Sequence, residues 1–180
     1  MRKERPRQRL ATWWRFGVLL LVSLGCSSRS APARAPLSAR PVDFAYYTAE
    51  GERITGQSLR GRVTAIVFVT TFDSASQLEV SELQSIVRRH APRINALVVV
   101  VEAPKYAPLL PVYSESLGLS IPVVIADYAT RTGAGPFGDL RRVPTLVVVD
   151  AKGRPRWRKE GFVAAGEIER QLRSITGPRP

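Results

Sequence analysis

The chain has 180 residues, 44% of them hydrophobic and 23% charged, which is the composition of one soluble globular domain and too short for two. The net charge of +12 is concentrated near the N-terminus, because residues 42–180 carry 18 basic and 14 acidic side chains, a net +4. Nucleic-acid binding needs a concentrated basic face, so this balance argues against nucleic acid as a partner.

The N-terminal residues 1–25 have the features of a signal peptide. A strongly basic segment precedes the apolar run 16–25, which is too short to span a bilayer comfortably. Gly25-Cys26 directly after this run resembles the lipobox of bacterial lipoproteins, although Ser23 stands where that motif usually has Leu. The resemblance implies cleavage before Cys26 and lipid modification of its thiol.

A lipid on Cys26 would make the protein an exported, membrane-anchored lipoprotein that faces the periplasm. Ser27 resembles the residue found after the cysteine in lipoproteins passed on to the outer membrane, which favours that membrane over the inner one. The alternative is ordinary cleavage further on, within residues 30–35, which would discard Cys26 or leave it as an unpaired thiol.

Residues 27–41 are rich in Ser, Ala, Pro and Arg and have almost no large apolar side chain. Such a segment cannot bury enough surface to offset its ordering entropy, so it is expected to be flexible. With Cys26 it forms a lipid-anchored linker, residues 26–41, which leads into a domain at residues 42–177.

Strands and helices alternate through this domain. An alternating stretch predicts a short strand at 42–48, and 51–62 is a turn-rich connection. Four continuous β-branched apolar runs predict strands that are buried on both faces. A charged run predicts a fifth strand, which a tight turn at 150–153 joins to the fourth. These five strands lie at 63–70, 94–102, 121–127, 143–150 and 154–161.

Three segments have helical spacing. Residues 76–92 place four apolar side chains at that spacing, namely Leu78, Leu83, Ile86 and Val87. Residues 106–118 hold two prolines, so a helix there is short and starts at a proline. Residues 166–175 form the last helix, whereas 128–139 is a plain loop, because its glycines lack the strand-to-helix context of a phosphate-binding loop. The element order predicts an α/β fold, a central sheet flanked by helices.

The fifth strand carries the densest basic cluster. Arg154, Arg156 and Arg158 would share one face of a strand. Such charges are typical of a solvated edge strand, where they discourage edge-to-edge pairing. The alternative is a patch that binds a partner or a membrane surface.

Three local motifs, in this order, resemble the thioredoxin superfamily, in particular its exported TlpA-like and redoxin-like branch. Residues 59–83, "LRGRVTAIVFVTTFDSASQLEVSEL", align without a gap with the pattern "L-x-G-K-V-V-L-V-N-F-W-A-T-W-C-x-x-C-x-x-E-x-P-x-L". Val143-Pro144-Thr145 resembles the cis-proline strand start of that family. Residues 147–162 resemble its "L-I-D-x-x-G" hairpin. The resemblance implies a thioredoxin-like three-layer sandwich with a mixed β-sheet.

The same alignment places the two redox cysteines of the family at Asp73 and Ser76, with Ser74 and Ala75 between them. Thiol–disulfide exchange needs a thiolate, which neither residue provides, and the chain has no cysteine after Cys26. A cysteine peroxidase mechanism and a copper site of the Cys-x-x-x-Cys type are excluded for the same reason. Neither a metal nor a cofactor is expected, since His90 is a lone histidine interpreted as a surface or capping residue.

Capping of the following helix explains the small polar residues at 73–76. Asp73 and Ser74 compete as the N-cap, and Ser76 with Glu79 fits a capping box. Serine hydrolase chemistry would need a general base, and no His or Lys lies nearby in the sequence.

Recognition of a polypeptide could survive without cysteines. The resemblance implies that Arg142 and Val143, which precede Pro144, face Phe72 and present backbone groups to an extended chain. The alternative is that Pro144 only fixes a turn. We therefore expect a non-catalytic protein-binding or scaffolding lipoprotein. Two other hypotheses are an oxidoreductase that acts through an unconventional site and a small-ligand module that uses residues 128–139.

Overall fold

The computed structural model describes residues 39–177. The predicted signal peptide, Cys26 and most of the linker lie outside these residues. The described part contains a seven-stranded mixed sheet in the order β2-β1-β5-β4-β3-β6-β7. The strands are β1 Ala45–Tyr47, β2 Arg53–Thr55, β3 Val63–Val69, β4 Ile94–Val100, β5 Val123–Ile125, β6 Thr145–Val149 and β7 Pro155–Glu160.

The central strands confirm the predicted buried runs. Every residue of β3 and β6 is buried, as expected for strands covered on both faces. Strands β3, β4 and β5 are parallel, whereas β6 is antiparallel to β3 and pairs Thr145 with Phe68. The carboxyl ends of the parallel strands therefore meet the start of β6 at one end of the sheet.

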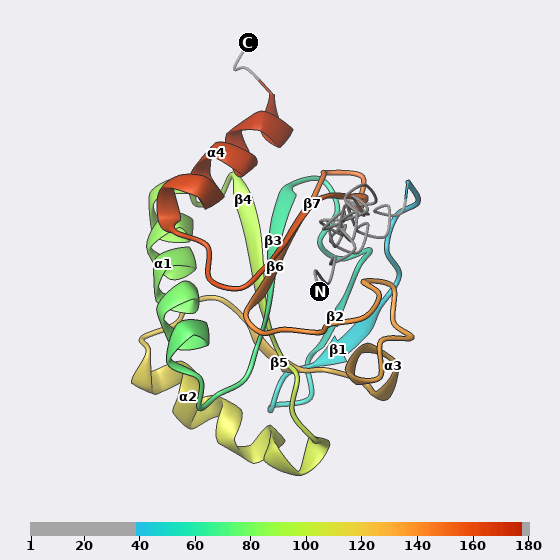
Figure 1. Cartoon of the computed structure of the whole chain (residues 1–180), viewed down its shortest axis with the longest axis vertical. Coiled ribbons are helices and arrows are strands. Elements are labelled where there is room, and N and C mark those ends of the chain that lie inside the picture. The colour runs from blue at the N-terminus through green and yellow to red at the C-terminus, as the bar shows by residue number, and fades with distance from the viewer. Residues whose placement is uncertain (1–38, 178–180) are drawn as a thin grey trace, which may run out of the picture. The chain divides into compact units, whose positions relative to one another are not determined.

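Helices cover one face of this sheet. Helices α1 Ser74–His90, α2 Leu110–Ser116 and α4 Ala165–Thr176 lie on one side of the sheet in Figure 1. All three contribute side chains to one core cluster. The 3-10 helix η1, Pro104–Leu109, leads into α2, which has Pro111 in its first turn. That agrees with the predicted proline start.

The opposite face is covered by shorter pieces. Phe44 and Phe137 pack against Phe68 and its neighbours in the second core cluster. Helix α3, Tyr128–Arg131, joins this layer through Thr130, whose hydroxyl lies 2.7 Å from the Tyr46 hydroxyl. Both clusters lie within residues 42–172, so the described region closes its own core.

Two segments differ from the prediction. The connection at 51–62 contains strand β2, because the β1–β2 hairpin pairs Tyr46 with Ile54 and buries both side chains. The loop at 128–139 begins with helix α3, which Asp127 caps by accepting a hydrogen bond from the Thr130 N–H at 2.7 Å. Both elements have only three or four residues, too short to show a clear period in the sequence.

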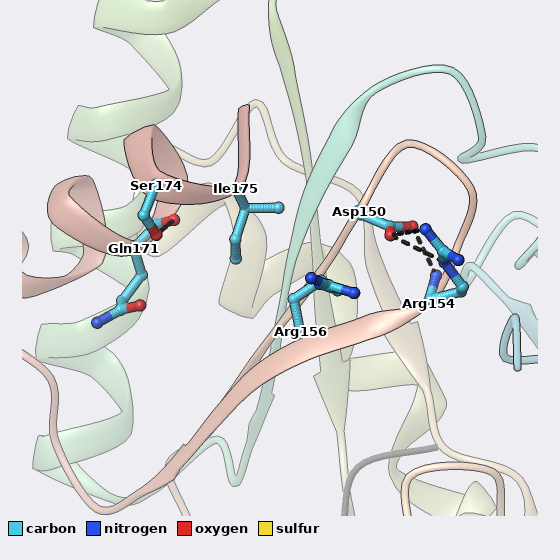
Figure 2. A pocket seen from close by; sticks show the side chains of 6 residues that line it. All are labelled: Asp150, Arg154, Arg156, Gln171, Ser174 and Ile175. Atoms are coloured by element: carbon cyan, nitrogen blue, oxygen red, sulfur yellow. Dashed lines mark hydrogen bonds and ion pairs between the residues drawn. The ribbon is translucent and has the colours of Figure 1, made fainter. Parts of the chain in front are cut away.

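The basic strand β7 lies at an edge of the sheet, as predicted, but the three arginines do not all share a face, because Arg154 and Arg156 line one cleft and Arg158 does not. A register shift between Val148 and Val149 leaves Arg156 as the extra residue of a bulge. Arg158 turns to the opposite layer and donates hydrogen bonds to the carbonyls of Phe137 and Asp139. Arg156 instead lines an open cleft beside α4 (Figure 2).

Candidate functional site

The stretch at 73–76 forms the first turn of α1 and its cap. Asp73 is the N-cap, and its carboxylate accepts hydrogen bonds from the Ser76 N–H at 2.8 Å and the Ser76 hydroxyl at 2.7 Å. The Ser76 hydroxyl and N–H hold the pKa of Asp73 below its usual range. Ser76 is fully buried, whereas Ser74 is exposed and Ala75 half-buried. The two positions aligned with redox cysteines therefore contact each other as a helix cap.

The predicted capping box is wrong. Ser76 does not cap the helix, and Glu79 points into the core, where it is 0% exposed. Its Oε2 accepts a hydrogen bond at 2.8 Å from the N–H of Val163, which lies in the segment between β7 and α4. Its Oε1 is buried and has no hydrogen-bond partner among the described residues.

Burial sets the electrostatics of Glu79. Burial away from water raises the pKa of its carboxyl from the usual 4.5 to about 7. The hydrogen bond from Val163 and the positive charge of Lys159 lower the pKa, but by less than burial raises it. Sequence reasoning missed this residue. A signal was present, because position 79 falls on the same helical face as the buried residues Val80, Leu83 and Ile86. Leu78, predicted to belong to that face, is 51% exposed.

A second carboxylate supports the loop that precedes the cap. Glu102 Oε1, just after β4, accepts hydrogen bonds from the Thr71 N–H at 2.8 Å and the Thr71 hydroxyl at 2.7 Å. The Gln77 amide donates to the Thr71 carbonyl at 2.8 Å. Tyr113 from α2 adds a buried hydroxyl that has no partner among the described residues. Its pKa is raised to about 12 by burial and by the charges of Glu102 and Asp73.

The Val143–Pro144 peptide bond is cis and lies immediately before β6. The Arg142 carbonyl accepts a hydrogen bond from the Thr145 hydroxyl at 2.5 Å, and the Pro144 carbonyl accepts one from the Gly161 N–H at 2.7 Å. Within the described residues, neither the N–H nor the C=O of Val143 has a hydrogen-bond partner.

Phe72 lies at the same end of the sheet as Val143, because Phe72 follows the end of β3 at Val69 by three residues, and Phe68 pairs with Thr145, two residues after Val143. Its side chain is 79% exposed. This end of the sheet therefore presents an exposed aromatic ring and the unpaired backbone groups of Val143. We call the residues Phe72, Arg142 and Val143 the candidate binding surface.

The other residues considered in the sequence have structural roles. His90 ends α1, with its Nε2 3.8 Å from a Glu169 carboxylate oxygen. In the loop 128–139, Gly135 packs against the backbone of Thr130, which leaves no room for a side chain there. Between residues 39 and 177, no three His, Cys, Asp or Glu side chains are grouped so that they could hold a metal ion. No helix in that range is both long and apolar enough to cross a membrane.

Comparison with known proteins identifies the architecture. No protein-family model and no curated protein sequence matches the chain. Solved structures do match. A thiol:disulfide interchange protein of the thioredoxin family from Chlorobium tepidum has a TM-score of 0.63 at 20% identity, covering 81% of this chain and 100% of the other.

Two further structures give the same result. A thiol:disulfide interchange protein DsbE from Chlorobium tepidum matches with a TM-score of 0.65 at 17% identity, over 79% of this chain and 100% of the other. A secreted disulfide oxidoreductase of Mycobacterium tuberculosis, homologous to E. coli DsbE, matches with 0.60 at 14% identity, over 72% and 93%. The chain has the thioredoxin-like fold, which confirms the predicted fold class, and its one cysteine leaves no disulfide pair within the chain.

Proposed function

We propose that this chain is a TlpA-like or DsbE-like thioredoxin-family protein without redox activity, which binds an extended polypeptide at the candidate binding surface. The observation that carries the proposal is the unpaired backbone of Val143 at the same end of the sheet as the exposed ring of Phe72. An extended peptide can add to these backbone groups as a strand would, and that interaction needs no thiol.

The redox positions support a binding role rather than catalysis. Asp73 and Ser76 satisfy each other as donor and acceptor, so neither is available as a nucleophile. The thiolate required for disulfide exchange is missing. The exposed aromatic ring of Phe72 offers the type of side chain that is enriched where proteins bind partners.

We predict that Phe72→Asp weakens binding of an unfolded, cysteine-free polypeptide by at least tenfold, because it replaces an exposed apolar contact with a charge that must be desolvated. Fluorescence anisotropy of the labelled polypeptide measures the dissociation constant. The matched control is Leu78→Asp, which makes the same change at another exposed apolar side chain, on the solvent side of α1. Equal loss in both variants, or no binding by the wild type, would contradict the proposal.

We also propose that the mature protein is exported and held at a membrane through a lipid on Cys26, facing the periplasm and more specifically at the outer membrane. The sequence features that support this are the apolar run 16–25, the following Gly25-Cys26 and the linker composition. The predicted result is a mature N-terminus at Cys26 with a mass increase for the lipid, measured by mass spectrometry of the protein from membranes. Cys26→Ser should leave the precursor unprocessed. An unmodified N-terminus beyond Ala33 would rule out the anchor.

A further inference from the structure

The end of the domain opposite the candidate binding surface carries a cluster of unpaired positive charges. We call this cluster the basic pole. Its six side chains are all exposed, and none forms an ion pair within the part of the chain that the structure describes. They are Arg60, Arg62, Arg88, Arg93, Lys152 and Arg156.

The sheet brings three of these cations together. Arg62 and Arg93 each come directly before a parallel strand, and the first residues of those strands, Val63 and Ile94, are paired. Arg60 lies against the β6–β7 turn, since its side chain is a neighbour of Gly153. The Gly61 N–H also donates to the Ala151 carbonyl at 2.9 Å, which fixes the loop beside that turn.

Arg88, Lys152 and Arg156 complete the pole from adjacent elements. Arg88 lies in the last turn of α1, and the chain turns from there into β4 through a hydrogen bond from the Arg93 N–H to the His90 carbonyl. Lys152 lies in the β6–β7 turn itself. Arg156 lines the open cleft of about 360 Å³ beside the end of α4, shown in Figure 2.

Carboxylates do not neutralise this end. In the same cleft Asp150 is held by Arg154, with a carboxylate oxygen 3.0 Å from the guanidinium. Glu169 is likewise held between Arg89 and Arg173. Both of these carboxylates are matched by an arginine outside the six, and the exposed Asp43 next to Val42 is outnumbered by the six cations, so the charge of the basic pole remains in excess.

At the opposite end of the sheet, exposed cations such as Arg53 and Lys105 are accompanied by exposed carboxylates such as Glu52 and Asp127, and other cations form ion pairs. There Arg141 pairs with Asp139, Arg158 with Glu160 and Lys159 with Glu167. Each of these ion pairs joins one cation to one carboxylate at 3.0 Å or less. The domain is therefore electrostatically polarised along its strands.

The chain enters the domain at the basic pole. The Val42 N–H donates to the Gly153 carbonyl at 2.9 Å, and Pro41 lies beside Gly153. The 38 residues before the described part, with the apolar run and Cys26, are therefore joined to the domain at its positive end. Figure 1 shows the start of the coloured chain and the end of α4 at the same end of the sheet.

We propose that the basic pole binds an anionic lipid surface and so fixes the orientation of the domain on the membrane. This inference rests on the proposed anchor, because the anchor brings this end of the domain to the lipid. The candidate binding surface would then face away from the membrane. Strand β3 has seven residues, so the two ends lie about 23 Å apart.

The expected strength follows from charge. A basic side chain near an anionic bilayer increases binding by about fivefold, and screening removes this gain beyond about 10 Å at moderate salt. Six unpaired cations on one end can therefore hold a domain that is already tethered. The absence of large apolar side chains among the six predicts that binding depends on lipid charge and not on insertion.

The test uses residues 35–180, which contain both cores and no lipid attachment site, with vesicles of phosphatidylcholine alone or mixed with phosphatidylglycerol. We expect co-sedimentation with the anionic vesicles only, and its loss when salt rises from about 0.05 to about 0.5 M. The triple variant Arg60→Glu, Arg62→Glu, Arg156→Glu should bind at least about a hundredfold more weakly, because it removes three attractive charges and adds three repulsive ones. The matched control reverses Arg53, Lys105 and Arg141 at the other end and should bind like the wild type.

Several outcomes would overturn the inference. These are no binding to anionic vesicles, equal binding to neutral ones, or equal loss in the two triple variants. A further contradicting outcome is release of the protein from the vesicles by short duplex DNA, when the DNA supplies a lower concentration of negative charge than the lipid. That result would identify another polyanion as the ligand of the basic pole. This polypeptide lacks Cys26, so vesicle binding and lipid attachment are tested independently. Vesicle binding can fail although mass spectrometry finds a lipid on Cys26, and it can succeed although mass spectrometry finds none.

Orientation can be measured directly, since residues 35–180 contain no cysteine. An environment-sensitive dye on Thr176→Cys, at the end of α4, should shift on anionic vesicles as it moves from water into the less polar headgroup layer, without reaching the hydrocarbon core. The same dye on Tyr128→Cys, near the opposite end, should not shift. Shifts at both positions would contradict a fixed orientation.

Discussion

Replacing Glu79 with glutamine should abolish most of the loss of stability that the wild-type protein shows between about pH 5 and about pH 8. The carboxyl of Glu79 has a pKa of about 7 in the folded protein, against 4.5 when it is exposed to water. The folded state therefore holds this proton more tightly than the unfolded state. The stabilisation from the protonated Glu79 carboxyl is therefore fully present at pH values below its pKa in the unfolded state. It is lost as the pH rises through its pKa in the folded state.

The size of the effect follows from the shift. A difference of one pKa unit corresponds to about 1.4 kcal/mol, so the wild type should lose about 2–3 kcal/mol of unfolding free energy over this interval through Glu79 alone. Glutamine cannot ionise, and its amide oxygen can still accept the hydrogen bond from the Val163 N–H. Any cost of burying its NH₂ group is the same at each pH and does not change the slope.

Urea denaturation of both proteins at several pH values measures this difference. Other titrating groups contribute equally to both curves and cancel. Glu82→Gln is the matched control, because Glu82 lies on the same helix and is only half-buried. Parallel pH–stability curves for the wild type and Glu79→Gln would show that burial does not perturb Glu79.

The central strands could be predicted from sequence because their signal is local. The β-branched runs that became β3, β4 and β6 are apolar at almost every position, which only a strand covered on both faces requires. The fold class followed from the order of these runs and the helical segments. The Asp73 cap was also visible, since Asp before a helical pattern is a strong N-cap signal.

Long-range partners explain what could not be predicted. Glu79 resembled the second half of a capping box, a local motif, but its actual partner is the Val163 N–H, 84 residues away in the sequence. The placement of Arg156 depends on a bulge that appears only when β7 pairs with β6. The basic pole depends on the same kind of information, because its six cations are spread from residue 60 to residue 156.

Introducing two cysteines, Asp73→Cys with Ser76→Cys, should create a disulfide in a chain that has none. The two native side chains already point toward each other, since the Ser76 hydroxyl donates to the Asp73 carboxylate at 2.7 Å. They are one helical turn apart, a separation that a disulfide of about 2.05 Å can close. Position 73 caps the helix, where the N-terminal dipole lowers the pKa of a thiol and favours the reactive thiolate.

The fold should tolerate the double substitution. Losing the Asp73 cap costs about 1 kcal/mol, which is small against a typical stability of 5–15 kcal/mol. Position 73 is half-buried and position 76 is buried, so the first thiol can meet a substrate and the second can resolve the mixed disulfide. We therefore expect the variant of residues 35–180 to reduce insulin in the presence of dithiothreitol, and the wild type to add nothing to the rate of dithiothreitol alone.

Thiol titration under oxidising and reducing conditions measures the pairing, with circular dichroism as the check on folding. The matched control is Asp73→Cys with Ala75→Cys, because the side chain at 75 leaves the helix in another direction and its thiol should stay free. A folded Asp73→Cys, Ser76→Cys variant whose two thiols never pair would contradict the alignment of 73 and 76 with redox cysteines. Insulin reduction by the wild-type chain would contradict its assignment as non-catalytic, since neither Asp73 nor Ser76 can carry thiol–disulfide exchange.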